Sequence, residues 1–386
     1  MPKINLLYVV TKLELGGAQK HLLDLITYLD KRRYNIFLFT ASEGLLVQDA
    51  LSIEGLTLKC SRFLERPINP LKDALALIEI YRFIKRNKID VVHTHSSKAG
   101  ILGRLAARLA KTRIILHTVH GWSFHDYQPI VGRNFYIWLE RLCGKFTDKL
   151  IVVSNHDRQK GLENRIGDEK KYALIRYGIN SLEFGLKDQN IRRGWGINSN
   201  DLVVGMVSCF KPQKSPGDFI KLAYSVHKNL PDVKFILVGD GILRKAIERL
   251  IYKLNLGKQV VLTGWRRDMP RILSMMDVFV LTSLWEGLPI SALEAMAASL
   301  PVVATHTGGI SEVISEAKTG FLVQPRRIDK MAEKVSSLLK DENLRSQIGR
   351  NAKGSLGQDY TVRGMVRYTD NLYWDLISKK EMPYAN

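Results

Sequence analysis

The segment that decides the fold reads Glu286-Gly287-Leu288-Pro289-Ile290-Ser291-Ala292-Leu293-Glu294. It follows the apolar run Val278-Phe279-Val280-Leu281, which is typical of a buried strand. An alanine-rich helix follows, and we expect it to begin at Pro289, where a missing N–H costs nothing. Glu286 then lies on the strand-to-helix loop, and Glu294 lies roughly 7–8 Å further along the helix axis.

The chemistry of this segment suits a ligand with a phosphate between two sets of hydroxyls. The helix N-terminus offers unpaired N–H groups and the positive end of a dipole, and both favour a phosphate. An acid, an anion site and a second acid in line match a sugar nucleotide, with its hexose, diphosphate and ribose. The alternative is that Glu286 and Glu294 are surface residues at an ordinary helix start, and this segment alone does not decide between the two.

The same order of strand and helix recurs along the whole chain. Helical patterns such as Ala18–Leu29, Leu71–Arg86 and Gly100–Ala110 separate short apolar runs. Buried runs separated by helices indicate an α/β fold with parallel sheets covered on both faces. The predicted strands are Ile4–Val10, Tyr34–Thr40, Leu56–Cys60, Val91–His95, Ile114–Val119, Leu150–Ser154, Leu202–Ser208, Val233–Val238, Val260–Thr263, Val278–Leu281, Pro301–Ala304 and Phe321–Val323.

The alternation lapses once, at the polar stretch 187–194, which we interpret as part of a linker. The chain then has two doubly wound, Rossmann-like domains, residues 1–190 and 191–360. The segment 361–386 contains the helical pattern Val362–Ile377, which we expect to return to the first domain. A ligand is expected in the cleft between the domains, at the carboxyl ends of the strands.

Length and composition indicate a soluble two-domain protein with an anionic partner. The chain has 386 residues, three scattered cysteines and a net charge of +20. Residues 1–190 carry 30 Lys and Arg against 19 Asp and Glu, so the excess is not confined to a tail. No zinc-finger or RNP-like motif accompanies the charge, which disfavours nucleic acid and leaves a phosphorylated ligand or an anionic membrane.

The same features place the protein in the cytoplasm. No apolar run approaches the roughly 18 residues of a membrane span. The run Ile4–Val10 is too short for a secretory signal, and three unpatterned cysteines suit a reducing compartment. The pattern over 98–113 puts Arg104, Arg108 and Lys111 on one helical face. This is either a membrane-binding surface or the solvated face of a helix that covers the sheet.

Several strand-to-helix loops could approach a ligand. Gly16-Gly17 opens the first helix, but the G-x-G-x-x-G fingerprint of dinucleotide cofactors is absent. Gly239-Asp240-Gly241 and Gly308-Gly309 follow later strands, where glycine lets the backbone come close to a ligand. Lys214 precedes a helix that begins near Ser215 or Pro216 and could neutralise a diphosphate. Each of these features also occurs as an ordinary turn or a solvated loop.

Four histidines fall near predicted strand ends: His93, His95, His117 and His120. They have neither a matching set of acids nor an i, i+4 pairing on a helix, so we predict no metal site. His120, in Val119-His120-Gly121-Trp122, lies where a strand ends and a loop begins. A side chain there could hydrogen-bond a substrate hydroxyl.

Taken together, these loops resemble the retaining GT-B glycosyltransferases of family 4, also called group 1. The resemblance extends over nearly the whole chain, and its strongest element is the Glu-x7-Glu pair of Glu286 and Glu294. The supporting elements are Gly16-Gly17, Val238-Gly239-Asp240-Gly241, Gly308-Gly309 with Glu312, and Tyr177-Gly178-Ile179-Asn180.

The resemblance implies roles for individual residues. Glu286 would contact hydroxyls of the transferred sugar, Glu294 would hold the ribose, and backbone N–H groups near Leu288 and Ile290 would meet the diphosphate. Lys214 matches the lysine of the family's Arg-x4-Lys phosphate clamp, and Cys209 stands at the arginine position. Either Lys211 supplies the missing charge or the donor binds more weakly. The nucleotide base would lie near Gly264-Trp265-Arg266, and His120 would lie near the sugar.

The implied reaction is transfer of a hexose from a nucleotide diphosphate sugar, with a uridine nucleotide favoured, to an acceptor hydroxyl with retention of configuration. Neither a metal nor a cofactor is implied. The acceptor would be a lipid-linked or growing glycan in cell-surface polysaccharide synthesis, with the enzyme at the cytoplasmic face of the membrane. Two alternatives stay open: a catalytically poor GT-B protein that binds a nucleotide sugar within a glycosylation complex, and a nucleotide-sugar epimerase.

Overall fold

The computed structural model describes residues 3–185 and 189–381. The chain forms two compact units: Met1–Gly178 with Val362–Asn386 (unit 1), and Ile179–Thr361 (unit 2). The chain enters and leaves unit 2 at neighbouring points, because Ile179 N donates to Tyr360 O and Ile179 forms a parallel bridge with Thr361. The division therefore comes earlier than residue 190. Residues 187–188 of the expected linker and 382–386 of the expected C-terminal segment lie outside the described residues.

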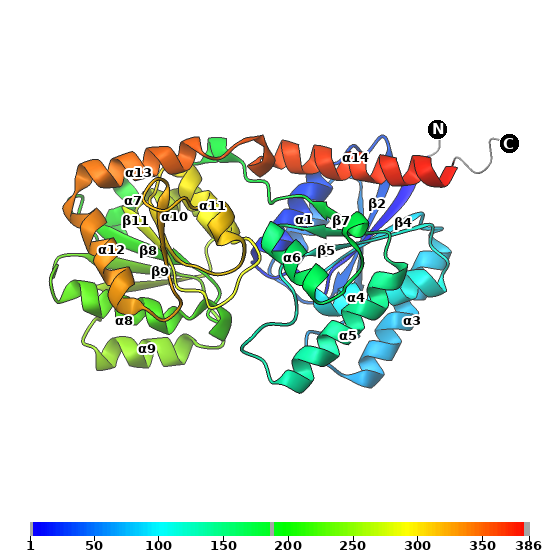
Figure 1. Cartoon of the computed structure of the whole chain (residues 1–386), viewed down its shortest axis with the longest axis horizontal. Coiled ribbons are helices and arrows are strands. Elements are labelled where there is room, and N and C mark those ends of the chain that lie inside the picture. The colour runs from blue at the N-terminus through cyan, green and yellow to red at the C-terminus, as the bar shows by residue number, and fades with distance from the viewer. Residues whose placement is uncertain (1–2, 186–188, 382–386) are drawn as a thin grey trace. The chain divides into compact units, whose positions relative to one another are not determined.

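Unit 1 contains a parallel sheet of seven strands in the order β3-β2-β1-β4-β5-β6-β7 (Figure 1). Side chains of β1 alternate between two cores: Leu6 and Tyr8 pack into one, Leu7 and Val9 into the other. The strands are β1 Ile4–Val9, β2 Tyr34–Ala41, β3 Leu56–Ser61, β4 Val91–His95, β5 Ile114–Val119, β6 Lys149–Val152 and β7 Tyr172–Leu174.

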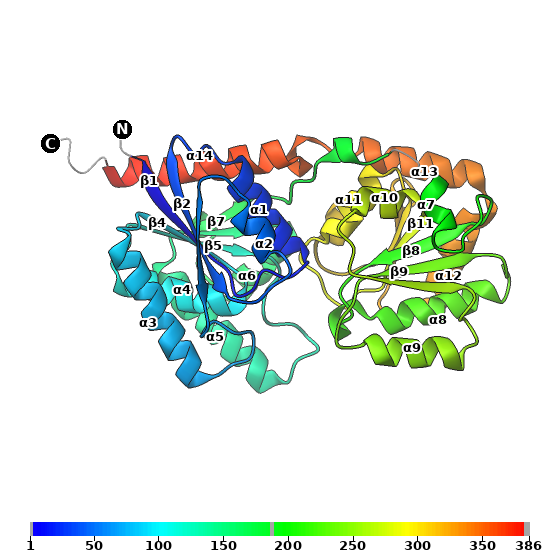
Figure 2. The same ribbon diagram turned by 180° about the vertical axis from the view of Figure 1, so that it is seen from behind.

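Helices cover both faces of this sheet, and Figure 2 shows the same arrangement from behind. The first core takes side chains from α1 and α14, such as Leu22 and Tyr373, and the second takes them from α3 and α4, such as Ile80 and Ala106. The C-terminal helix α14 therefore belongs to unit 1. The helices are α1 Gly17–Tyr28, α2 Val47–Leu51, α3 Pro70–Arg86, α4 Ser97–Leu109, α5 Ile130–Phe146, α6 Asn155–Glu163 and α14 Val362–Glu381.

Unit 2 contains a parallel sheet of six strands in the order β10-β9-β8-β11-β12-β13. The strands are β8 Val203–Val207, β9 Lys234–Val238, β10 Val260–Gly264, β11 Val278–Leu281, β12 Val302–Thr305 and β13 Gly320–Val323. The helices are α7 Gln189–Arg193, α8 Pro216–His227, α9 Arg244–Lys253, α10 Met269–Ser274, α11 Ile290–Ala297, α12 Ile328–Lys340 and α13 Glu342–Gly354.

Both units are doubly wound sheets, as the alternation of strand and helix predicts. Two details differ from the sequence prediction. The helix α11 begins at Ile290, because Pro289 has the extended ψ of 112° of a residue before the first turn. The short strand β7 was not predicted, since two of its three residues are only half-buried and the run lacks a clear apolar signal.

The strand orders place the ligand-binding edges. Strand order reverses between β1 and β4 in unit 1 and between β8 and β11 in unit 2. In open α/β sheets, ligands bind outside the carboxyl ends of the strands at such a switch point. The relevant loops are therefore 10–16 and 96 in unit 1, and 208–215 and 282–289 in unit 2.

The expected basic face over 98–113 is wrong in one respect. Arg104 is fully buried, and its guanidinium lies 2.7 Å from Glu140 Oε2 on α5 and donates to Gly100 O. Helical periodicity placed it with Arg108 and Lys111, but a tertiary partner 36 residues away draws it inward. Among the described residues, no helix is long and apolar enough to cross a membrane.

Glu140→Ala should destabilise the protein strongly, because it leaves the Arg104 charge buried without its counterion. Breaking one partner of a buried pair costs about 3–5 kcal/mol. Urea denaturation at pH 7.5 measures the change in the free energy of unfolding. The matched control is Glu248→Ala, which removes an exposed glutamate that pairs with Arg244 on α9 and should change stability by less than about 1 kcal/mol. Equal effects for the two variants would contradict the buried-pair account.

Candidate functional site

The loops after β8 and β11, at the switch point of unit 2, are tied together by hydrogen bonds. Leu284 N donates to Gln213 O at 2.7 Å, and Gln213 Nε2 donates to Trp285 O at 3.0 Å. The buried Thr282 hydroxyl lies 3.0 Å from Lys214 O and 2.9 Å from Ser215 O. Sequence analysis did not single out Thr282 or Gln213, although a polar residue directly after a buried strand is the signal that could have found Thr282.

Lys214 and Glu286 meet within this pair of loops. The ammonium of Lys214 forms an ion pair with Glu286 Oε1, and the side chains are 17% and 7% exposed. A short 3-10 turn, Pro212–Lys214, ends at Ser215 in the left-handed region with φ of 44°, and α8 begins at Pro216. The lysine thus lies at the predicted helix start, and the acid that faces it is the first glutamate of Glu-x7-Glu.

A third loop, after β12, packs its backbone against the same acid. Gly308 has φ of 59°, and a Cβ atom there would lie 2.0 Å from Glu286 O. Gly309 N donates to Gly287 O at 2.6 Å, and the Thr307 hydroxyl donates to Leu284 O at 3.1 Å. Glycine is needed at 308 because no side chain fits between the two backbones. The loop forms a 3-10 turn, Gly308–Glu312, in place of the α-helix start expected from sequence.

The start of α11 completes this part of the site. Leu288 and Ile290 are 3% and 6% exposed, and Pro289 precedes the first turn. No side chain caps this N-terminus within the described residues, so its first N–H groups keep the positive end of the helix dipole. Glu294 lies one turn further and is 4% exposed.

The loops after β9 and β10 lie beside that of β8. Gly239 has φ of 120°, and a Cβ atom there would lie 2.0 Å from Ser208 O, so the β9 loop also requires glycine. Gly239 N donates to Gly264 O, which brings in the segment with Trp265 and Arg266. Trp265 is 40% exposed and therefore accessible to a planar ligand. Cys209, a free thiol, follows Ser208 in the β8 loop.

Arg266 is paired with an acid and is not a free cation at this edge. Its guanidinium forms two hydrogen bonds with Asp268, at 2.6 and 2.9 Å, and lies over the Trp195 ring at 5.6 Å. These contacts balance its charge and fix its orientation. Of the predicted donor-side residues, the structure brings Lys214, Glu286, Gly308 and the start of α11 into one cluster, with Gly239 and Trp265 on the adjoining loops.

In unit 1, the loops after β1 and β4 meet through Thr11 and Ser96, whose hydroxyls lie 2.8 Å apart. Gly16 is the residue before α1, in extended conformation, and Gly17 is the first residue of the helix. Gln19 donates through Nε2 to Lys12 O and holds this loop in place. The predicted glycine pair therefore lies at the switch point of unit 1.

His120 is half-buried and contacts two buried side chains, His95 and Tyr177. Its Nε2 lies 2.9 Å from His95 Nδ1, and its Nδ1 lies 2.7 Å from the Tyr177 hydroxyl. Both ring nitrogens of His120 are thus engaged with other side chains. A hydrogen bond to a substrate hydroxyl requires one of these partners to give way.

His21, from α1, completes a cluster that sequence analysis did not foresee. Ligand atoms of His21, His95 and His120 lie within 4.8 Å of one another, and these are the residues of the described chain that could hold a metal ion. The prediction of no metal site rested on the lack of matching acids and of an i, i+4 pair, and it did not consider a group of three histidines from separate elements. Whether the protein uses a metal stays a prediction. Histidine 21 was missed because it stands alone on a helix, far in sequence from the others.

Burial keeps the three histidines of this cluster neutral, together with the nearby His93 and His117. Burial lowers the pKa of His21 and that of His93 to about 3. Burial also holds the pKa of His95, His117 and His120 well below its usual value, and the neighbouring histidines add to this effect.

Comparison with known proteins agrees with the fold. Residues 15–181 match the family model described as Glycosyltransferase Family 4, and residues 187–355 match the model described as Glycosyl transferases group 1. An Escherichia coli protein, the UDP-Gal:alpha-D-GlcNAc-diphosphoundecaprenol alpha-1,3-galactosyltransferase, is 32% identical over 98% of both chains. The chain belongs to this glycosyltransferase family.

Other relatives are more distant. The capsular polysaccharide biosynthesis glycosyltransferase CapM of Staphylococcus aureus is 23% identical over 82% of this chain and 85% of its own. Among solved structures, Anabaena HepE in complex with UDP-glucose has a TM-score of 0.83 and 21% identity over 96% of this chain and 99% of its own. Sucrose-phosphate synthase of Thermosynechococcus elongatus has a TM-score of 0.85 and 19% identity over 98% of this chain and all of its own. The two structures share the GT-B fold of this glycosyltransferase.

Gly308→Ala should disturb the candidate site without unfolding the protein. The added Cβ would displace the Glu286 carbonyl and carry that loop away from Lys214. We expect amide hydrogen exchange at Leu284 and Gly309, whose N–H groups bond across these loops, to speed up at least tenfold, while the melting temperature falls by only a few degrees. Gly257→Ala is the matched control, because a Cβ at Gly257 meets nothing within 4 Å. Unchanged amide exchange at Leu284 and Gly309 in Gly308→Ala would contradict the packing argument.

The neutral histidines predict that stability falls with acid. Their folded pKa lies below the ordinary value of 6.5, so the unfolded chain binds protons first as pH drops from 6.5 toward 3. Each such histidine removes up to about 1.4 kcal/mol per pH unit in that window. Urea denaturation at pH 7.5, 6.5 and 5.5 measures this slope.

The matched test of this pH dependence uses two variants. His21→Leu should lower the slope by about one proton, and Ile242→Leu, a non-titratable change at an exposed position, should leave it unchanged. A slope in His21→Leu equal to that of the unaltered protein would show that His21 is not held neutral.

Proposed function

We propose that this glycosyltransferase moves galactose from UDP-galactose to a lipid-linked glycan acceptor, with retention of the anomeric configuration. Unit 2 binds the donor and unit 1 binds the acceptor. The observation that carries the proposal is the meeting of Lys214, Glu286 and the uncapped start of α11 at the switch point of unit 2. This arrangement supplies a cation, a hydrogen-bonding acid and aligned N–H groups around one place.

The choice of donor and acceptor class draws on relatives. The Escherichia coli relative, at 32% identity, is a UDP-galactose-dependent enzyme that acts on a diphosphoundecaprenol-linked sugar. The Anabaena structure holds UDP-glucose on the same fold. The Staphylococcus aureus relative takes its name from capsular polysaccharide biosynthesis. These similarities support a role for the chain in cell-surface polysaccharide synthesis at the cytoplasmic face of the membrane.

The proposed mechanism is electrostatic. The diphosphate leaves against Lys214 and the N–H groups of Leu288 and Ile290, which stabilise its charge as the glycosidic bond breaks. Glu286 orients hydroxyls of the sugar, and Glu294 holds the ribose. Front-face displacement follows, in which an oxygen of the departing phosphate accepts the proton of the acceptor hydroxyl. Trp265 offers a face for the base, and the reaction proceeds without a metal or cofactor.

The remaining predicted contacts enter the proposal with smaller roles. The Lys214–Glu286 ion pair must loosen when a diphosphate binds, because Lys214 then serves two acids. Lys211 compensates in part for Cys209 at the arginine position, so the donor binds more weakly than in relatives with the full clamp. His120 contacts the sugar only when it exchanges one of its two ring hydrogen bonds for a sugar hydroxyl.

Two other functions make different predictions. A catalytically poor partner protein would bind UDP-sugars without turnover, and Cys209 is the feature that favours it. A nucleotide-sugar epimerase would change the sugar nucleotide without any acceptor. Incubation of the purified chain with UDP-galactose and a synthetic lipid diphosphate N-acetylglucosamine separates all three, because only transfer yields UDP and a disaccharide. NMR of that disaccharide then reports whether the new linkage is alpha.

Replacement of the central pair tests the assignment of residues. Lys214→Ala should lower kcat/KM by about 10²–10³, the usual cost of losing one preorganised group at a developing charge. Glu286→Ala should lower it comparably, whereas Glu294→Ala should act mainly by raising KM for the donor. Lys221→Ala, which removes an exposed lysine that pairs with Asp218 on α8, is the control and should retain activity. Full activity in Lys214→Ala would reject the phosphate clamp.

A further inference from the structure

A basic cavity lies at the other end of the unit 1 sheet from the loops discussed so far. Its volume is about 520 Å³, and residues that precede β5, β6 and β7 contribute to its wall. It therefore opens at the amino ends of these strands, away from the switch point. One lining residue, Asp148, is acidic. Six are cationic: Arg108, Lys111, Arg113, Lys145, Lys171 and Lys380.

Half of these cations are not balanced inside the protein. Lys380, from α14, pairs with Asp148 at 2.8 Å, and Lys171 donates to three carbonyl groups at the end of α5. Within residues 3–185 and 189–381, Arg108, Lys111 and Lys145 have no acidic partner. The cavity thus presents three uncompensated charges to a ligand.

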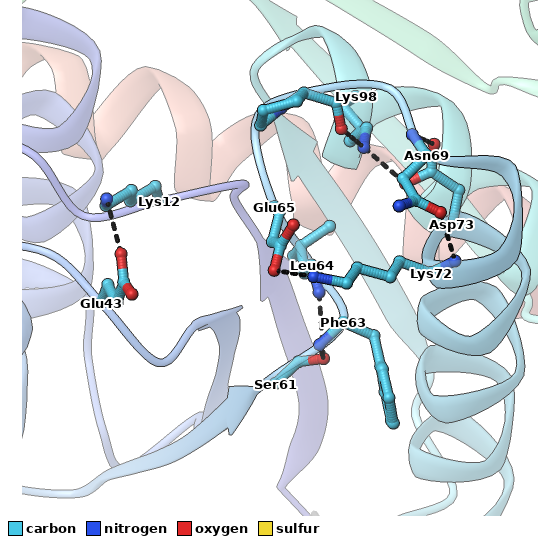
Figure 3. Close-up of polar contacts among 11 residues, drawn as sticks. Lys12, Glu43, Ser61, Phe63, Leu64, Glu65, Asn69, Lys72, Asp73 and Lys98 are labelled. Carbon is cyan, nitrogen blue, oxygen red and sulfur yellow. Dashed lines mark hydrogen bonds and ion pairs between the residues drawn. The ribbon is translucent and has the colours of Figure 1, made fainter.

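The opposite edge of unit 1 shows what ordinary surface pairing looks like in this chain. There Lys12 pairs with Glu43, Lys72 with Glu65, and Lys98 with Asp73, as Figure 3 shows. These three lysines are each balanced by a carboxylate of a neighbouring loop or helix. The unpaired group near the cavity is therefore a local feature and not a general consequence of the +20 charge.

An exposed apolar stripe leads from the carboxyl edge of the sheet to this cavity along α5. Val131, Phe135 and Trp138 are 83%, 49% and 56% exposed, and the two aromatic rings stack at 6.2 Å. Their spacing of four and three residues puts them on one side of the helix. Lys145 comes seven residues after Trp138, on the same side, and lines the cavity. Leu109, beside Arg108 on α4, is 62% exposed.

We infer that this face of unit 1, defined by Val131, Phe135 and Trp138 with the cavity cations Arg108, Lys111 and Lys145, docks on an anionic lipid bilayer. Aromatic and aliphatic side chains enter the interface between headgroups and chains, and neighbouring cations bind lipid phosphates. Each cation near an anionic surface adds attraction, and salt screens that attraction.

The apolar stripe decides between a membrane and a nucleic acid. A polyanion alone would account for the cations, but it gives no role to Val131 or to the neighbouring exposed Ile130.

The arrangement also deepens the proposed function, because α5 begins just after the loop that starts at His120. Docking along α5 would hold the acceptor edge of unit 1 close to a lipid-linked substrate. Vesicle binding itself requires neither donor nor acceptor.

The inference is tested by co-flotation of the full-length protein with lipid vesicles at low and high salt. One set of vesicles is pure phosphatidylcholine, and the other contains roughly 30% phosphatidylglycerol. We expect binding to the anionic vesicles that falls as salt rises, and little binding to the neutral ones. The triple variant Arg108→Gln, Lys111→Gln, Lys145→Gln should bind more than tenfold more weakly. The double variant Phe135→Ser, Trp138→Ser should weaken binding while its salt dependence stays.

The matched control is Lys245→Gln, Arg249→Gln, Lys253→Gln, which removes the same charge from the exposed surface of α9 in unit 2. It should bind vesicles within about twofold of the unaltered protein. Equal losses in the two triple variants would overturn the inference, since they would show a response to net charge alone. Binding to a single-stranded oligonucleotide but not to vesicles would replace the membrane with nucleic acid. If the protein transfers galactose but does not bind vesicles, only the docking face is rejected and the proposed function stands.

Discussion

The candidate site of this protein depends on the close approach of three loops at one edge of the unit 2 sheet. The Thr282 hydroxyl holds the carbonyl groups of the β8 loop, and Gly308 lets the β12 loop lie against the Glu286 carbonyl. These contacts bring Lys214 to Glu286 beside the start of α11. A partly buried charge pair of this kind is stabilising only where its geometry is fixed, and the neighbouring backbones fix it. The switch point in strand order explains why the loops after β8 and β11 are neighbours at all.

Much of the fold could be predicted, because strands buried on both faces are continuous apolar runs. The runs Val91–His95, Ile114–Val119 and Val278–Leu281 coincide with β4, β5 and β11. Prediction failed where tertiary contacts decide the outcome. Periodicity put Arg104 on an outer, basic helical face, but its ion pair with Glu140 on another helix holds it in the core. Strand β7 was missed because only one of its three residues is fully buried.

The candidate site was predicted unevenly for a related reason. Local rules place Glu286 on a loop and Lys214 before a helix, but only the sheet order brings them together. The resemblance to family 4 supplied the roles, and the matched family models support the family itself. His21 could not be foreseen, because nothing near it in sequence announces that α1 packs against His95 and His120. The hydrogen bonds at both nitrogens of His120 likewise depend on Tyr177, more than fifty residues away.

A crystal structure of the chain with UDP-galactose is the most direct measurement of this account. Anomalous scattering from a sulfur-substituted diphosphate would locate the phosphorus groups without ambiguity. We expect the diphosphate within hydrogen-bond distance of the N–H groups of Leu288 and Ile290 and of the Lys214 ammonium, with Glu286 turned to the sugar and Glu294 to the ribose. A diphosphate bound away from the start of α11, with the Lys214–Glu286 pair unchanged, would contradict the central claim.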